Sequence, residues 1–282
     1  MSLIRLIHGA LDGLALHYES VGEGPATLLI HGLGGFAESW RYTAAALVAH
    51  ARVISFDLPG FGQSAKPHGA YTFDFFVQVI RELLERLDAD RVRLVGHSLG
   101  GGIATAFALA YPDRVERLAL VGATVPGFPL HPSVVYRLMV LPGVGELLSS
   151  LVTRRVCVAA LRRCFYAPDR DEIAFLVEHE YRARTARDGR AAYLATLRGV
   201  KTEFTTRAAA YRAALADWDR PTLVIHGRED RIVPWSHADA AARGLRNAQT
   251  RWLDRCGHFP QIEHAAAVNS WLQEFLLAGA GR

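Results

Sequence analysis

The stretch from Arg91 to Tyr111 reads R-V-R-L-V-G-H-S-L-G-G-G-I-A-T-A-F-A-L-A-Y and decides the fold. Its first residues form a short apolar run typical of a buried parallel strand. From Gly101 onward the apolar residues predict a core helix that ends before Pro112. A G-x-S-x-G turn, Gly96 to Gly100, lies between the two. Its glycines let the neighbouring backbone come close, so we expect the turn to hold Ser98 out over the sheet as a candidate nucleophile.

Composition limits the classes of protein that this chain can belong to. The chain has 282 residues, of which half are apolar, so it can bury one large core and a smaller inserted subdomain. Its net charge is only +4, and its arginines are interspersed with acids, which argues against a nucleic-acid groove. The first thirteen residues are too polar for a signal peptide, and no apolar run approaches the length of a membrane span. We therefore expect a cytoplasmic protein that neither binds nucleic acid nor inserts stably into a membrane.

Cysteine usage agrees with a reducing compartment. Cys157, Cys164 and Cys256 are an odd, sparse set without C-x-x-C spacing. Cys256 lies two residues before His258, but no further ligands are spaced for zinc, so we interpret it as a buried structural thiol. We expect neither a metal nor a cofactor.

The N-terminal part predicts an antiparallel edge hairpin that leads into a glycine-rich loop. Strand-like runs over residues 3–10 and 14–19 flank the turn signal Asp12-Gly13, and a continuous apolar strand follows over residues 26–30. It runs into His31-Gly32-Leu33-Gly34-Gly35. The phosphate-binding spacings G-x-x-x-x-G-K-[ST] and G-x-G-x-x-G are both absent. We therefore prefer an H-G-x-G-G loop whose Leu33 N–H converges with the Leu99 N–H on one small volume. Two such donors would hold the oxyanion of a tetrahedral intermediate, each worth about 3 kcal/mol.

The next segments predict helices over residues 38–50 and 71–87 and a strand over residues 53–56. That strand ends in Asp57-Leu58-Pro59-Gly60-Phe61-Gly62-Gln63-Ser64, a turn rich in proline and glycine. Asp57 is a conceivable catalytic acid. It precedes Ser98, however, and its carboxylate can accept local N–H bonds, so we interpret it as structural.

Beyond a strand over residues 115–122, only helical stretches appear for nearly a hundred residues. They cover residues 134–141, 145–158 or beyond, 170–187, 190–197 and 206–215. We interpret this block as a helical cap that rises from the carboxyl edge of the sheet, where ligands sit in open α/β proteins. The predicted organisation is an α/β core over residues 1–124 and 217–282, with the cap inserted over residues 125–216.

The sheet resumes with strands over residues 221–226 and 248–253, and a helix over residues 266–277 closes the chain. Asp230 follows the first of these strands and His258 follows the second. Both lie at the edge expected for Ser98, in the order serine, acid, histidine.

At this point the sequence resembles the α/β-hydrolase fold family over its whole length. The matching segments are His31 to Gly35, Asp57 to Ser64, Gly96 to Gly101, Gly227 to Pro234 and Gly257-His258. The resemblance implies an eight-stranded, mostly parallel sheet with a first antiparallel strand, helices on both faces, and a helical cap between the sixth and seventh strands. It also implies Ser98 as nucleophile, His258 as base and Asp230 as orienting acid.

Chemistry supports the same roles. A serine hydroxyl is a poor nucleophile until an imidazole takes its proton, and a carboxylate fixes the tautomer of that imidazole. Glu229 and Asp254 are the alternative acids. Among twelve histidines, His31 belongs to the oxyanion loop, His97 adjoins the nucleophile and His226 lies inside a strand.

Three functions remain open, and we favour a carboxylesterase acting on small to medium apolar acyl esters. The alternative is a carbon–carbon bond hydrolase, because the tail Gly257 to His264 resembles that of the meta-cleavage product hydrolases. Those enzymes usually carry asparagine, tryptophan and an H-G-x-G-P-G loop where this chain has His97, Phe259 and His31 to Gly35. The third function is a non-catalytic small-molecule binder. For the two enzymes we expect an apolar ester or ketone substrate and a monomer or homodimer.

Overall fold

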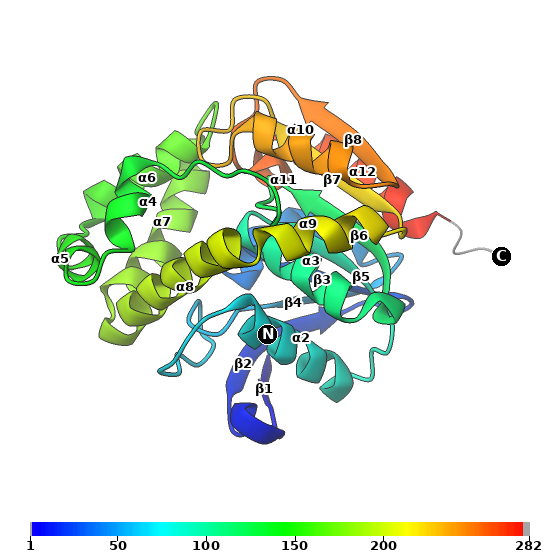
Figure 1. Cartoon of the computed structure of the whole chain (residues 1–282), viewed down its shortest axis with the longest axis horizontal. Coiled ribbons are helices and arrows are strands. Elements are labelled where there is room, and N and C mark those ends of the chain that lie inside the picture. The colour runs from blue at the N-terminus through cyan, green and yellow to red at the C-terminus, as the bar shows by residue number, and fades with distance from the viewer. Residues whose placement is uncertain (1, 279–282) are drawn as a thin grey trace.

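The computed structural model describes residues 2–278, which are built around an eight-stranded sheet (Figure 1). The strands are β1 Ser2–Arg5, β2 Ala15–Val21, β3 Ala26–Ile30, β4 Arg52–Phe56, β5 Val92–His97, β6 Val115–Val121, β7 Thr222–Gly227 and β8 Ala248–Leu253. Their order across the sheet is β1-β2-β4-β3-β5-β6-β7-β8. Strands β3 to β8 are parallel, so the mostly parallel sheet predicted from the sequence is confirmed.

The N-terminal hairpin departs from the prediction in two ways. The second strand, β2, is the antiparallel one, because it opposes both β1 and β4. The predicted first strand over residues 3–10 is also too long: β1 ends at Arg5, and Gly9–Leu11 forms a 3₁₀ turn. Leu6 still exchanges hydrogen bonds with Leu14 and Gly13, but the next two N–H groups, those of Ile7 and His8, bind the buried carboxylate of Glu82.

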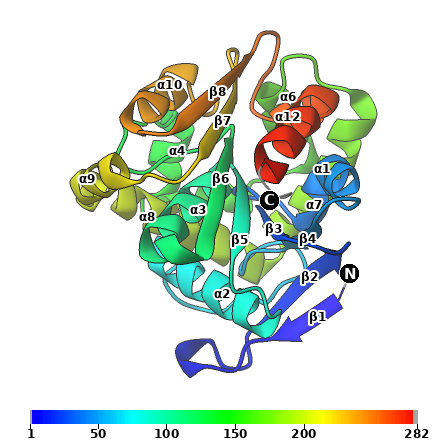
Figure 2. The ribbon, with the colours of Figure 1, turned by 90° about the vertical axis from the view of Figure 1, so that its right-hand side faces the viewer.

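Helices cover both faces of the sheet (Figure 2). The helices of the core are α1 Arg41–Leu47, α2 Phe73–Arg86, α3 Leu99–Ala110, α10 Trp235–Gly244, α11 Pro260–Glu263 and α12 Ala265–Leu277. Successive residues of β3 show the two layers. Leu28 packs in the cluster that contains α2 and α3, whereas Leu29 packs in the cluster that contains α12. This alternation follows from the two-residue period of a strand.

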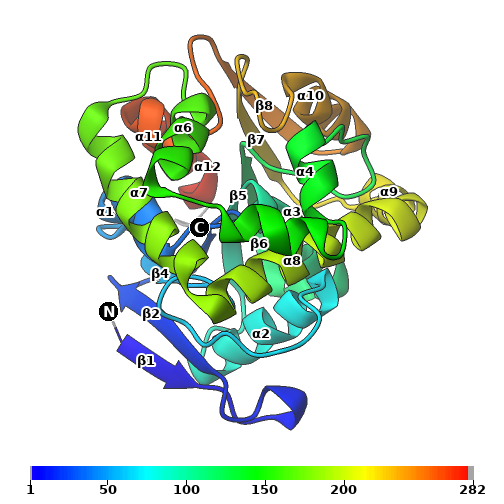
Figure 3. The ribbon, with the colours of Figure 1, turned by 90° about the vertical axis from the view of Figure 1, so that its left-hand side faces the viewer.

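The segment between β6 and β7 is helical. Most of it gathers at one end of the sheet, and its last helix runs back along the sheet toward β7 (Figures 1 and 3). Its helices are α4 Val134–Met139, α5 Val144–Ser150, α6 Arg154–Cys164, α7 Arg170–Thr185, α8 Arg187–Thr206 and α9 Ala208–Asp217. The insertion is thus where the resemblance puts the cap. Within residues 2–278, no helix is both long and apolar enough to cross a bilayer.

Several helix bounds differ from the sequence prediction. The helix predicted over 145–158 is two helices, because Thr153 accepts a hydrogen bond from Val156 N at 3.3 Å and starts α6 anew. Helix α8 is longer than the predicted 190–197, and the helix predicted over 38–50 begins as a 3₁₀ turn, Ala37–Trp40. Helix α10 was not predicted.

Candidate active site

The turn between β5 and α3 holds Ser98 in a strained backbone conformation. Ser98 has φ +52° and ψ −121°, a region that residues other than glycine rarely adopt. The strand and the helix can approach each other this closely only because Gly96 and Gly100 lack side chains. A β-carbon on Gly100 would lie 2.2 Å from Ile30 O, and one on Gly96 would lie 2.5 Å from Gly100 O. The backbone therefore fixes the direction of the Ser98 Cα–Cβ bond.

The three residues predicted to act together are in direct contact. His258 Nε2 lies 2.9 Å from Ser98 Oγ, and His258 Nδ1 lies 2.7 Å from Asp230 Oδ2. Because the carboxylate accepts, Nδ1 carries the proton, and Nε2 is left to accept the serine proton. Ser98, Asp230 and His258 are 8%, 7% and 4% exposed, so the contact is largely shielded from water.

Asp230 is held as a carboxylate by its surroundings. Its Oδ1 accepts N–H bonds from Ile232 at 2.8 Å and Val233 at 2.9 Å. Burial alone would raise its pKa, but the charge of His258 and hydrogen bonds from His226 and His258 outweigh burial and lower the pKa below its usual value. An ionised acid is what orients and stabilises an imidazolium.

Neither alternative acid contacts His258. Glu229 Oε2 accepts the N–H of Cys256 at 3.0 Å, and the exposed Asp254 pairs with Arg228 at 2.9 Å. Cys256 itself is buried, which agrees with a structural thiol. Burial raises the pKa of its thiol far above the usual value.

Two further histidines surround the site, and the sequence assigned neither of them a role. His226 Nε2 lies 2.9 Å from Val233 O and 3.2 Å from Asp230 Oδ2. His97 donates from Nε2 to His258 O at 2.7 Å. Burial, with the neighbouring His258, lowers the pKa of His97 to about 3, so His97 is neutral. The only sequence signal for His226 is a polar residue in an otherwise apolar buried strand.

The glycine-rich loop is ordered by His31. Gly32 O accepts hydrogen bonds from His31 Nδ1 at 2.7 Å and from Gly35 N at 3.0 Å, while His31 Nε2 accepts the Leu58 N–H at 2.9 Å. Since the N–H and C=O of a trans peptide point in opposite directions, the Leu33 N–H points away from His31.

The same loop lies against the nucleophile turn. A β-carbon on Gly32 would sit 2.9 Å from Ser98 Cβ. Leu99 is the first residue of α3, so its N–H has no helical partner four residues earlier. Both N–H groups expected to bind an oxyanion therefore belong to segments that touch Ser98.

Asp57 has the structural contacts expected of it. Its Oδ1 accepts the Ala37 N–H at 2.7 Å, and its Oδ2 accepts the Gln63 N–H at 2.7 Å and lies 3.0 Å from His17 Nδ1. These bonds tie the turn after β4 to β2 and to the segment after the glycine-rich loop.

The helical insertion touches His258 directly. The His258 N–H donates to Cys164 O, the last residue of α6, at 2.6 Å. The next residue, Phe165, stacks on Phe259 with ring centroids 5.0 Å apart. The backbone and the flank of His258 are thus covered by the insertion.

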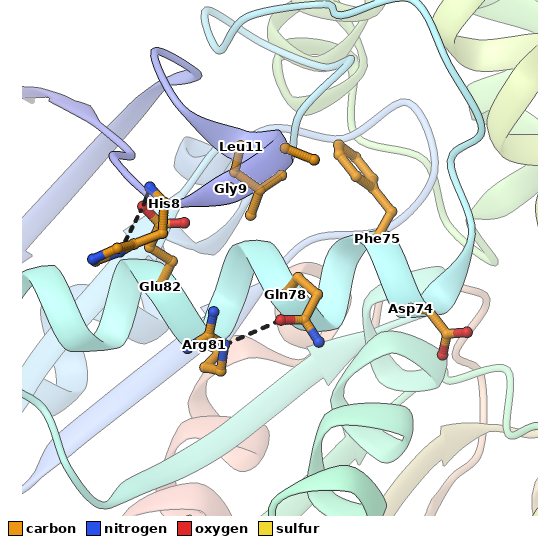
Figure 4. A pocket seen from close by; sticks show the side chains of 9 residues that line it. His8, Gly9, Leu11, Asp74, Phe75, Gln78, Arg81 and Glu82 are labelled. Carbon is orange, nitrogen blue, oxygen red and sulfur yellow. Dashed lines mark hydrogen bonds and ion pairs between the residues drawn. The ribbon is translucent and has the colours of Figure 1, made fainter.

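A surface cavity of about 400 Å³ lies apart from these residues, between the 3₁₀ turn and α2 (Figure 4). Glu82 at its wall is fully buried and holds the backbone of His8 at 2.9 Å. The cavity contains no residue of the Ser98, Asp230 or His258 segments, so the arrangement of those three side chains, and not this hollow, marks the candidate active site.

Comparison with known proteins identifies the family of the chain. Residues 25–265 match the profile of the alpha/beta hydrolase fold. The chain is 32% identical over 274 residues, 94% of this chain and 91% of the relative, to the 2-hydroxymuconate semialdehyde hydrolase of Pseudomonas sp. strain CF600. It is 30% identical over 271 residues, 94% of each chain, to the 2-hydroxy-6-oxo-2,4-heptadienoate hydrolase of Pseudomonas putida F1.

A solved structure gives the same result. The meta-cleavage product hydrolase of Pseudomonas fluorescens IP01 superposes with a TM-score of 0.82 at 28% identity, covering 98% of this chain and 97% of that one. The fold, the order of the matching segments and the similarity over nearly the whole length agree. The chain therefore belongs to the alpha/beta hydrolase fold family.

Proposed function

We propose that the chain is a serine hydrolase in which Ser98 is the nucleophile, His258 the general base and Asp230 the orienting acid. The observation that carries this proposal is the continuous series of contacts from Ser98 Oγ through His258 to Asp230 Oδ2. The backbone N–H groups of Leu33 and Leu99 would bind the oxyanion. Residues 125–216 would form the cap, which closes the site from above.

The proposed reaction begins with attack of Ser98 Oγ on a substrate carbonyl while His258 Nε2 takes the hydroxyl proton. His258 then returns that proton to the leaving group, which leaves an acyl group on Ser98. A water molecule, deprotonated by His258 in turn, adds to the acyl carbon and releases the acid. No step needs a metal or a redox partner.

For the bond that is cleaved, the relatives favour the carbon–carbon hydrolase over the carboxylesterase that we favour from the sequence. The two relatives described above are named as hydrolases of a semialdehyde and of a 6-oxo-dienoate, and the solved structure is named as a meta-cleavage product hydrolase. In such a substrate the leaving carbon is stabilised by conjugation, so the same acid–base pair can protonate it. We propose a conjugated ketone of this kind as the first substrate class.

An ester substrate is the second candidate, and one observation favours it. Where the carbon–carbon hydrolases usually have asparagine, this chain has His97, and its Nε2 is bonded to His258 O. Its ring also packs 4.8 Å from that of Phe259. The Nε2 N–H at this position is therefore unable to bind a dienoate, and an ester would not require it.

Two assays separate the candidates. A carbon–carbon hydrolase consumes a 2-hydroxy-6-oxodienoate with loss of its visible absorbance, at a kcat/KM well above that for p-nitrophenyl butyrate. An esterase shows the reverse order. The Ser98→Ala variant abolishes both signals if the proposal holds, and turnover of either substrate by that variant contradicts it.

A further inference from the structure

Helix α7 carries two acid–arginine pairs of the same spacing on opposite faces. Glu178 pairs with Arg182 at 2.7 Å, and Glu180 pairs with Arg184 at 2.9 Å. The side chains of the first pair are 36% and 79% exposed, but those of the second are only 14% and 13% exposed. Because two residues advance about 200° around a helix, one pair faces solvent and the other faces the molecule's interior.

The inward pair lies above the glycine-rich loop. A β-carbon on Gly34 would lie 3.9 Å from Glu180 Oε1 and 3.6 Å from the ring of Tyr193 on α8. Gly32, two residues earlier, is the glycine that abuts Ser98. The inward pair is therefore separated from the nucleophile by one short loop, on the side covered by the insertion.

Cys164 connects the same region to the base. Burial raises the pKa of the Cys164 thiol to about 12, and the charges of Glu180 and Asp230 both add to the shift. The thiol thus lies within electrostatic reach of the inward pair and of the acid that orients His258.

Arg184 is the main charged group that faces Glu180. Arg184 also lies over the Tyr193 ring, 4.6 Å from its centroid. Burial raises the pKa of Tyr193, and the neighbouring Tyr193 phenol, with burial, raises that of Tyr136, so both phenols are neutral. Burial also raises the pKa of Glu180, which Arg184 opposes. Arg184 is thus the cation that stabilises the carboxylate of Glu180.

We propose that Glu180 sets the charge specificity of the active site: it occupies Arg184 and thereby selects substrates whose cap-facing end is uncharged but bears an oxygen. A ketone or hydroxyl oxygen can accept from Arg184 or a phenol while the pair stays intact. A substrate carboxylate must compete with Glu180 for the same guanidinium, at close range and away from water. This inference rests on the proposed function only in that Ser98 performs the hydrolysis.

The test uses pairs of p-nitrophenyl esters of equal length. One member of each pair ends in a carboxylate and the other in a methyl ketone, with two, three or four methylenes before the ester carbonyl. We expect the wild-type protein to hydrolyse the ketone at least tenfold better, by kcat/KM, for the pair that reaches Arg184. Glu180→Gln should raise kcat/KM for the carboxylate at least tenfold and leave the ketone within about twofold. Rates with Ser98→Ala protein are subtracted as background.

Matched variants isolate the cause. Glu178→Gln removes the same charge from the outward face and should change neither substrate. Glu180→Gln/Arg184→Gln should lose the gain, because no cation remains to bind the carboxylate. Glu180→Leu replaces Glu180→Gln if the latter does not fold, and it should show the same gain.

Two results overturn the inference. The first is a wild-type protein that hydrolyses the carboxylates as well as the ketones at every length. The second is a Glu180 variant that changes both members of each pair equally. Failure of the proposed function looks different, since Ser98→Ala would then hydrolyse the ketone esters as fast as the wild-type protein.

Discussion

The imidazole of His226 lies 3.2 Å from Asp230 Oδ2, the same oxygen that His258 Nδ1 approaches at 2.7 Å. Two histidines therefore share one buried carboxylate oxygen. His226 Nε2 also lies 2.9 Å from Val233 O, and since a carbonyl can only accept, Nε2 carries the proton. One N–H thus ties Asp230 to the loop that carries it, and we infer that His226 positions the proposed acid.

Replacing His226 should lower turnover more than substrate binding. We expect His226→Leu to reduce kcat for p-nitrophenyl butyrate about tenfold, the size of one hydrogen bond to a charged group, with KM within about twofold. His226→Gln keeps an N–H donor and should recover part of the loss. His264→Gln is the control, because the His264 side chain is partly exposed and its one side-chain hydrogen bond in the described residues is to Arg255 O at 3.1 Å. If His226→Leu kept the kcat of the wild type, His226 would not be a positioning residue.

Ser98→Ala should abolish hydrolysis without unfolding the protein. A loss of about 10⁴-fold or more in kcat is expected for removal of a serine nucleophile, and Tm should change by less than about 3 °C. Ser149→Ala serves as the matched control, because its buried hydroxyl bonds only the backbone of α5, at Gly145 O, 2.7 Å away, and Glu146 O, 3.4 Å away. The measurements are initial rates and thermal unfolding of the wild type and both variants. Equal rates in the wild type and Ser98→Ala would exclude Ser98 as the nucleophile.

The depressed pKa of Asp230 predicts a specific dependence of stability on pH. The folded pKa is below the unfolded value near 3.8, so Asp230 stabilises the fold above about pH 4, and that stability is lost as the pH falls further toward the folded pKa. Asp230→Asn lacks this contribution. Urea unfolding between pH 7 and pH 3 should show the free energies of unfolding of the two proteins converging as the pH falls. Parallel curves would contradict the shift.

The nucleophile turn should tolerate no β-carbon at Gly100. Gly100→Ala would bring the new atom 2.2 Å from the backbone oxygen of Ile30, and because the backbone must move, we expect a loss of about 3 kcal/mol or more. Gly13→Ala meets nothing within 4 Å, and its φ of +77° should cost only about 1 kcal/mol. Chemical denaturation of both variants measures the difference. Equal losses would mean that the turn can relax.

Much of the site could be predicted from the sequence, because Ser98 directly follows β5, and Asp230 and His258 lie three and five residues after the ends of β7 and β8. In a parallel sheet such positions meet at one edge, so the order of Ser98, Asp230 and His258 was sufficient to bring them together. His31 to Gly35 could be predicted for the same reason.

Other features could not be predicted, since they depend on tertiary contacts. Helix α7 has acid–arginine pairs on two faces, and the sequence does not say which pair is buried. The break before α6 interrupts an apolar pattern that continues through it. His226 resembles any other polar residue in a strand until the fold brings Asp230 beside it.

The hydrogen bond from the His258 N–H to Cys164 O also matters for engineering the protein. Through this bond the insertion helps to hold His258 in place. Exchanging the insertion for that of a relative would therefore alter the support of His258 as well as substrate selectivity. In a chimera whose α6 ends elsewhere, no backbone carbonyl would lie next to the His258 N–H. That buried amide would then lack an acceptor, and the loop that carries the imidazole would be less firmly held. Graft boundaries should therefore keep residues 164 and 165 with the parent protein.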